Sequence, residues 1–107
     1  MQFDEIKSGV KEINFDSLRM DCDNYFEAVV LKEELSKLVN RLNGVLGSPV
    51  WPSNQRLSLE VRQVINSFGG IMPGQTLYFR NQGSDVIFAM LWPWQDGIHT
   101  TLKVVKK

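Results

Sequence analysis

The sequence holds one candidate nucleophile and one candidate base, because Cys22 is its only cysteine and His99 its only histidine. A Cys–His pair activates a thiolate only where the two side chains meet in the fold. A lone cysteine is more often a small apolar residue, and nothing in the spacing brings these two together. The pattern therefore predicts no catalytic residue and favours a non-catalytic protein over an enzyme.

Metal and phosphate chemistry are weakly supported as well. Asp21, Asp23 and His99 are metal-ligand types, but neither a zinc spacing nor a calcium loop connects them. Short Asx side chains close turns by bonding nearby backbone, which explains the two aspartates. The glycine-rich segment at 69–74 lies between a helix and a strand, whereas a phosphate cradle usually leads from a strand into a helix. We expect no metal site and no cofactor.

Charge and hydropathy limit the partners and the compartment. The 107 residues carry 12 Lys+Arg and 12 Asp+Glu, so we expect no basic face and no nucleic acid. The longest apolar run covers residues 86–92, far short of the roughly 20 residues that span a bilayer. The first residues do not resemble a signal peptide. These features predict a cytoplasmic protein that does not enter a membrane.

The balanced charge is unevenly distributed along the chain. Residues 1–34 hold nine acids and four bases, and residues 35–107 hold three acids and eight bases. The two halves then carry −5 and +5. Such halves complement each other inside one fold or across a self-association interface, although charges that are simply spread over a solvated surface would need no such explanation.

The tryptophans are the most informative of the remaining residues. Trp94 precedes the Asp96-Gly97 tip, where a small domain has difficulty burying it, and tryptophan is enriched in interface hot spots. Trp51 stands between two prolines, and with Gly69-Gly70 it is a candidate wall of a small-ligand pocket. The plainer alternative is that Trp51 and Trp92 belong to the core and Trp94 packs locally.

The elements that position these residues indicate one α+β domain over residues 1–107. Leucines at helical spacing predict a helix at about 32–46, which Gly47 and Pro49 end. A second amphipathic helix is predicted at about 57–68, and a short one in the first dozen residues. The segments 16–20 and 25–30 are typical of a hairpin. Residues 48–55 are predicted to form a loop.

The C-terminal third alternates with period two and predicts a three-stranded antiparallel meander over about 75–105. Its strands are expected at 75–80, 85–92 and 98–105, with turns at 81–84 and 95–97. The Asp96-Gly97 loop places Met90 opposite Lys103 and Trp92 opposite Thr101. The turn at 81–84 places Phe79 opposite Val86.

Both faces of this meander are apolar, so both need cover. We expect the helices at 32–46 and 57–68 to cover the aromatic face. The aliphatic face must then meet the N-terminal segment or a second protein chain, because large apolar patches are rarely left exposed. The candidate interaction surface consists of Ile87, Leu91, Leu102, Val104 and Trp94.

Two functions of different classes follow. The first is a small non-catalytic protein-interaction or accessory module, which binds another protein or associates with itself. The second is a small-ligand-binding protein or minor enzyme with a pocket between helices and sheet near Trp51 and Gly69-Gly70. The mass in solution separates the two, because only the first requires a partner.

Overall fold

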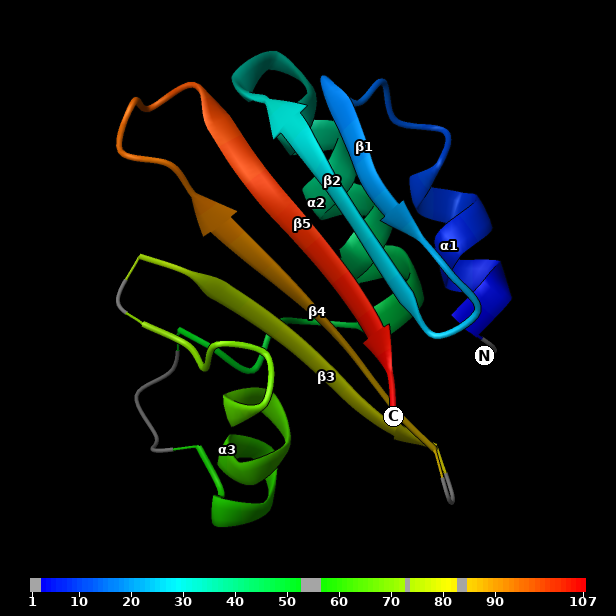
Figure 1. Ribbon diagram of the computed structural model, residues 1–107, viewed down its shortest axis with the longest axis vertical. Helices are drawn as coiled ribbons and strands as arrows, with labels where there is room; N and C mark the ends of the chain where they lie inside the picture. Colours follow the sequence, from blue (N-terminus) through cyan, green and yellow to red (C-terminus); the bar gives the residue numbers. More distant parts are fainter. Residues whose placement is uncertain (1–2, 53–56, 73, 83–84) are drawn as a thin grey trace.

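The computed structural model describes residues 3–52, 57–72, 74–82 and 85–107. They form one α+β domain in which three helices cover a five-stranded antiparallel sheet (Figure 1). In chain order the elements are α1 (Phe3–Val10), β1 (Ser17–Asp21), β2 (Tyr25–Leu31), α2 (Lys32–Leu46), α3 (Leu59–Asn66), β3 (Thr76–Gln82), β4 (Asp85–Pro93) and β5 (His99–Lys106). The strands lie in the order β1-β2-β5-β4-β3. The predicted class and the C-terminal meander are confirmed.

Helices α1 and α2 lie against the aliphatic face of the sheet. Ile6 of α1 and Leu38 and Leu42 of α2 have no exposed surface there. Because α2 begins directly after β2, the chain has no loop in which to change sides. Helix α2 therefore runs back along the sheet on the face toward which Ala28 and Val30 point. The leucine stripe therefore meets the sheet, as its spacing predicts.

Helix α3 lies on the opposite face, where the aromatic side chains gather. Its Ile65 is buried with Leu77, Phe88 and Met90, and Phe68 meets Phe88 edge-on at a centroid distance of 5.4 Å. The expectation that both long helices cover this aromatic face is wrong for α2. A helical period identifies which side of a helix is apolar, but it does not say which face of the sheet that side meets.

The aliphatic face is thus covered by the N-terminal segment, one of the two occupants that the sequence left open, together with α2. Asp21, at the end of β1, forms ion pairs with Lys11 at 2.5 Å and Lys7 at 2.9 Å. The hydrogen bonds from Lys11 and Lys7 lower the pKa of Asp21. These pairs join α1, and Lys11 just after it, to the end of the edge strand β1.

The register between the strands is partly as predicted. Met90 pairs with Lys103 and Trp92 with Thr101, as the Asp96-Gly97 loop requires. The β3–β4 pairing differs, because Val86 lies opposite Asn81 instead of Phe79. Strand β3 continues through Gln82, so the connection is shorter than the expected turn at 81–84. A shift of two residues keeps every side chain on its predicted face.

Parts of three predicted connections lie outside the described residues: 83–84 of the turn at 81–84, 53–55 of the loop at 48–55, and Pro73 of the segment at 69–74. The helix predicted at 57–68 is shorter than expected. It follows an N-cap at Ser58, whose Oγ accepts a hydrogen bond from the backbone N–H of Val61 at 3.3 Å. Within the described ranges, no helix is long and apolar enough to cross a membrane.

Candidate functional site

The structure divides the predicted interaction surface into two parts. Ile87, Leu91, Leu102 and Val104 lie beneath α1 and α2 and are at most 4% exposed. Because the chain's own helices occupy this face, these four side chains are not available to a partner in this fold. Trp94 is 38% exposed and lies on the other side of the sheet.

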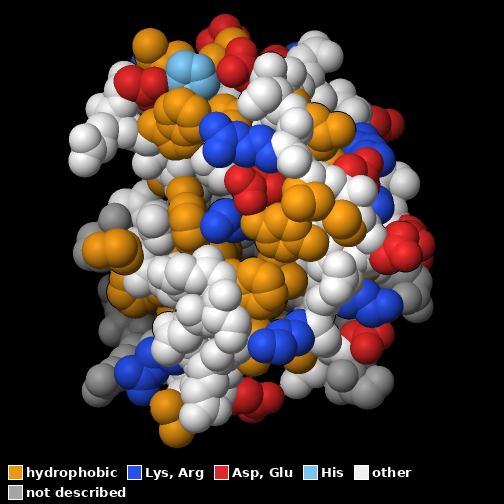
Figure 2. Space-filling view, in the orientation of Figure 1, with side chains coloured by type: hydrophobic (Ala, Val, Ile, Leu, Met, Phe, Trp, Pro, Cys, Tyr) orange, Lys and Arg blue, Asp and Glu red, His pale blue; other side chains and the backbone are white. Residues whose placement is uncertain are grey.

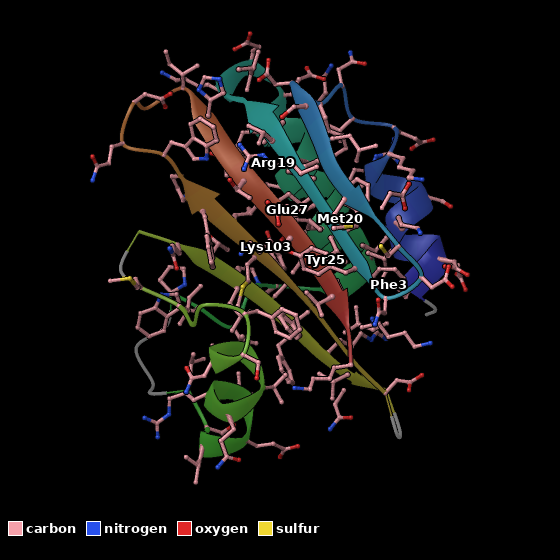
Figure 3. The ribbon with its side chains drawn as sticks, in the orientation of Figure 1. Phe3, Arg19, Met20, Tyr25, Glu27 and Lys103 are labelled. Atoms are coloured by element: carbon pink, nitrogen blue, oxygen red, sulfur yellow. The ribbon has the colours of Figure 1, made fainter. Side chains whose placement is uncertain are left out.

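That other side is covered over only part of its width. Helix α3 packs beside β3 through Ile65, which is buried with Leu77 and Met90. Within the described part of the chain, no helix lies over β1 and β2 on this side (Figure 1). Hydrophobic side chains are interleaved there with basic and acidic ones (Figure 2). We call this uncovered part the open face. It is formed by Arg19, Met20, Tyr25, Glu27, Thr101 and Lys103 (Figure 3).

Strand geometry explains why polar side chains gather here. Successive side chains of a strand point to opposite faces, and since Phe26 and Ala28 pack under the helices, Tyr25 and Glu27 point the other way. The register shifts between Leu18 and Met20. Such a bulge re-aims a side chain, and it leaves Arg19 on the open face beside Met20.

Glu27 is the electrostatic centre of the open face. The Tyr25 hydroxyl donates a hydrogen bond to Glu27 Oε1 at 2.5 Å, and Arg19 Nη1 lies 4.0 Å from Oε2. Burial, and then the hydrogen bond to Glu27 and its charge, raise the pKa of Tyr25. Lys103 is the cross-strand partner of Glu27. Burial lowers the pKa of Lys103, while the Glu27 charge opposes that shift.

Three cations of this side of the sheet lie over aromatic rings. Lys103 Nζ is 3.6 Å from the ring centroid of Trp92, and Arg19 is 5.7 Å from the ring of Trp94. Lys107 lies 5.8 Å from the ring of Phe68. A cation held in this way contributes about 0.5–2 kcal/mol, depending on how far it is desolvated. The rings fix the position of each charge on the surface.

Trp94 is held at the rim of the open face by the neighbouring hairpin tip. Its indole Nε1–H donates to Thr101 Oγ1 at 2.8 Å, and its ring stacks on His99 at a centroid distance of 4.6 Å. Asp96 accepts hydrogen bonds from the backbone N–H groups of Ile98 and His99, and its other oxygen lies 2.6 Å from His99 Nδ1. These bonds lower the pKa of Asp96 to about 2.

A groove continues the open face toward the end of β5. Its volume is about 860 Å³. The β1–β2 turn, Phe68 and the last residues of the chain line it: Cys22, Asp23, Asn24, Tyr25, Phe68, Val105, Lys106 and Lys107. The open face and the groove share Tyr25, so they form one continuous surface along β5.

The candidate nucleophile and base do not meet. Cys22 follows β1 and bonds to Tyr25 at one end of the hairpin, whereas His99 pairs with Leu31 at the other end. The six steps along β2 from Tyr25 to Leu31 span roughly 20 Å of strand. Cys22 is exposed, not part of the core. In the residues that the structure describes, no cluster of three or more His, Cys, Asp or Glu side chains could hold a metal ion.

A second, smaller cavity of about 210 Å³ lies beside α3. The sequence suggested a pocket near Trp51 and Gly69-Gly70; Trp51 lines this cavity, and the two glycines are not among its lining residues. Trp51 Nε1 and Arg62 Nε are buried and have no hydrogen-bond partner among the described residues. A buried donor left without an acceptor costs about 1–3 kcal/mol. Trp92 Nε1 is in the same state, but Trp92 does not line this cavity.

Sequence reasoning did not identify Arg19, Tyr25, Glu27 and Lys103 as site residues. A signal existed within each strand, because Glu27 and Lys103 are charged residues inside apolar runs. The two residues become neighbours only because β5 lies between β2 and β4. No local sequence pattern predicts that strand order. Comparison of the chain with family models, with curated proteins and with solved structures finds no match.

Proposed function

We propose that this protein is a non-catalytic interaction module whose open face and adjoining groove bind an extended, acidic segment of another protein. The observation that carries the proposal is Lys103, which lies 3.6 Å from the Trp92 ring on the uncovered half of the sheet. Within the described residues neither Lys103 nor Lys107 has an ion-pair partner, and Glu27 is already bonded by Tyr25. The open face therefore carries two cations, Arg19 and Lys103, against the single carboxylate of Glu27.

The residue types support a protein partner. Tryptophan, tyrosine and arginine dominate binding hot spots, and Trp94, Tyr25 and Arg19 occur here together. Lys103 lies in β5, and Lys107 directly follows β5 and is hydrogen-bonded to Val86 through its backbone. Four residues of extended chain separate the two by roughly 13 Å. An extended segment with carboxylates at a similar separation would meet both, while its apolar side chains would contact Tyr25 and Phe68.

The test uses synthetic peptides in which glutamate alternates with valine and tryptophan, and matched peptides with lysine in place of glutamate. NMR titration of the ¹⁵N-labelled protein should shift the amides of Glu27, Thr101 and Lys103 with the acidic peptides only. Lys103→Glu should weaken binding at least about tenfold, since charge-assisted bonds contribute about 1.5–3 kcal/mol. Lys103→Met, which keeps the apolar stem, should give an intermediate loss.

Lys37→Glu is the matched control, because Lys37 lies on α2, on the far side of the sheet. It should leave peptide binding unchanged. An equal loss in both variants, or shifts away from the open face, would overturn the proposal. A dimer in solution that Lys103→Glu dissociates would also overturn it, because the occupant would then be a second copy of this chain.

A further inference from the structure

The cavity beneath α3 has two kinds of wall. Trp51 is fixed at the edge of β3, where its backbone C=O accepts the Leu77 N–H at 3.0 Å and the Val50 N–H donates to Leu77 at 2.8 Å. Helix α3 forms the facing wall of the cavity with Arg62, Ile65 and Asn66. The lining also includes Leu57 and Ile71. Most of the wall is therefore apolar, with polar groups contributed by three residues.

Two of those polar groups are donors that have no hydrogen-bond partner among the described residues. Nε1 of Trp51 and Nε of Arg62 are buried, and no acceptor in the described residues bonds to either. Arg62 also has no ion-pair partner within that part of the chain. Its guanidinium stays charged at every ordinary pH. No acceptor of the described lining, the Asn66 side chain included, bonds to either donor. The acceptor that best suits the Arg62 guanidinium carries a negative charge.

We propose that this cavity is a binding site for a small carboxylic acid whose apolar body is about the size of a single ring. The carboxylate would accept from Trp51 Nε1 and Arg62 Nε, and the body would contact Leu57, Ile65 and Ile71. The size follows from the volume: an apolar cavity of about 150 Å³ takes up benzene, and this one measures about 210 Å³. None of its lining residues belongs to the open face or the groove, so the site is independent of the proposed function.

Benzoate is the probe, and benzyl alcohol is its neutral match. NMR titration should shift the methyl signals of Ile65 and Ile71 with benzoate, with a dissociation constant of about 1 mM or tighter. Benzyl alcohol should bind at least about tenfold more weakly, because it lacks the charged acceptor. Arg62→Met keeps the apolar stem and removes the donors. This variant should bind benzoate no more tightly than the parent protein binds benzyl alcohol.

Trp51→Phe is a second, milder variant that keeps a ring and removes only the N–H, and it should weaken benzoate several-fold with little effect on benzyl alcohol. Arg41→Met is the control, because Arg41 pairs with Glu12 on the other side of the domain. If benzoate causes no methyl shift at Ile65 or Ile71, or if it binds Arg62→Met and Trp51→Phe as well as the parent, the assignment is wrong.

Discussion

The two halves of the sheet differ in how much cover they receive. Strands β3 and β4 are enclosed on both faces, by α2 on one side and α3 on the other, and Phe88 at their centre has no exposed surface. Strand β2 is covered on one face only, by α1 and α2, and every residue of the edge strand β1 is exposed. The uncovered side carries Arg19 of β1, Glu27 of β2 and Lys103 of the neighbouring β5. Charged side chains appear where the helical cover ends.

The helices on the two faces differ in number and in length, because α1 and α2 share one face and α3 packs alone on the other. At 1.5 Å per residue, the 15 residues of α2 extend about 22 Å, whereas the eight residues of α3 extend about 12 Å. The short helix covers two strands and leaves the rest of its face to solvent. The charged residues of the open face therefore lie beside the aromatic side chains packed around α3. The proposed partner would contact both.

Of the substitutions predicted from this difference in cover, Phe88→Ala should change the free energy of unfolding most. Phe88→Ala should lower the free energy of unfolding by about 3–5 kcal/mol, because both faces around it are packed and the cavity cannot collapse. Met20→Ala, on the open face, should change it by no more than about 0.5 kcal/mol. Urea unfolding measures both values. Similar losses for the two variants would mean that the open face is covered in solution.

A smaller effect is expected at the border between the halves, where Gly69 packs against Trp92. Gly69 has a φ of +99°, and an added Cβ would lie 2.6 Å from Cη2 of the Trp92 ring. Gly69→Ala should therefore cost about 1–3 kcal/mol. Gly44→Ala is the control: Gly44 lies within α2 in open space and its replacement should add up to about 1 kcal/mol. Thermal unfolding that ranks them in the reverse order would contradict this packing.

The smallest effect concerns the pH dependence of the open face. The pKa of Tyr25 is raised in the folded protein, by burial and then by Glu27, so unfolded Tyr25 loses its proton first as the pH rises. Its contribution to stability is complete below about pH 10, the ordinary tyrosine value, and is lost above it. Tyr25→Phe should therefore flatten the fall in stability on the alkaline side.

Urea unfolding at several pH values above and below 10 measures that slope. Tyr78→Phe is the comparison, because burial also raises the pKa of Tyr78, but in the enclosed core. In Glu27→Gln the pKa of Tyr25 should fall and still remain above its ordinary value, since burial is the larger cause. An unchanged pKa in that variant would show that Glu27 does not hold the Tyr25 hydroxyl.

Much of the fold could be predicted because the signals are local. The leucine period from Leu35 to Leu46 defines α2, and the Asp96-Gly97 loop fixes the β4–β5 register. The β3–β4 register could not be predicted, because a turn of different length gives the same alternation and the same faces. Trp94 was predicted as a candidate contact residue and is partly exposed, whereas Ile87 and Leu102 were assigned to a surface that α1 and α2 occupy.

The sequence by itself determined the helices, the strands and the composition of each face, because all three depend on neighbours within a few residues. Only the tertiary structure decided which helix covers which face and which strands become neighbours. Pairing β2 with β5 joins residues 68 to 80 positions apart, and its energy comes from contacts that exist only after folding. That pairing creates both the Glu27–Lys103 strip and the uncovered surface around it. The chemistry of the candidate site therefore belongs to the fold more than to any motif.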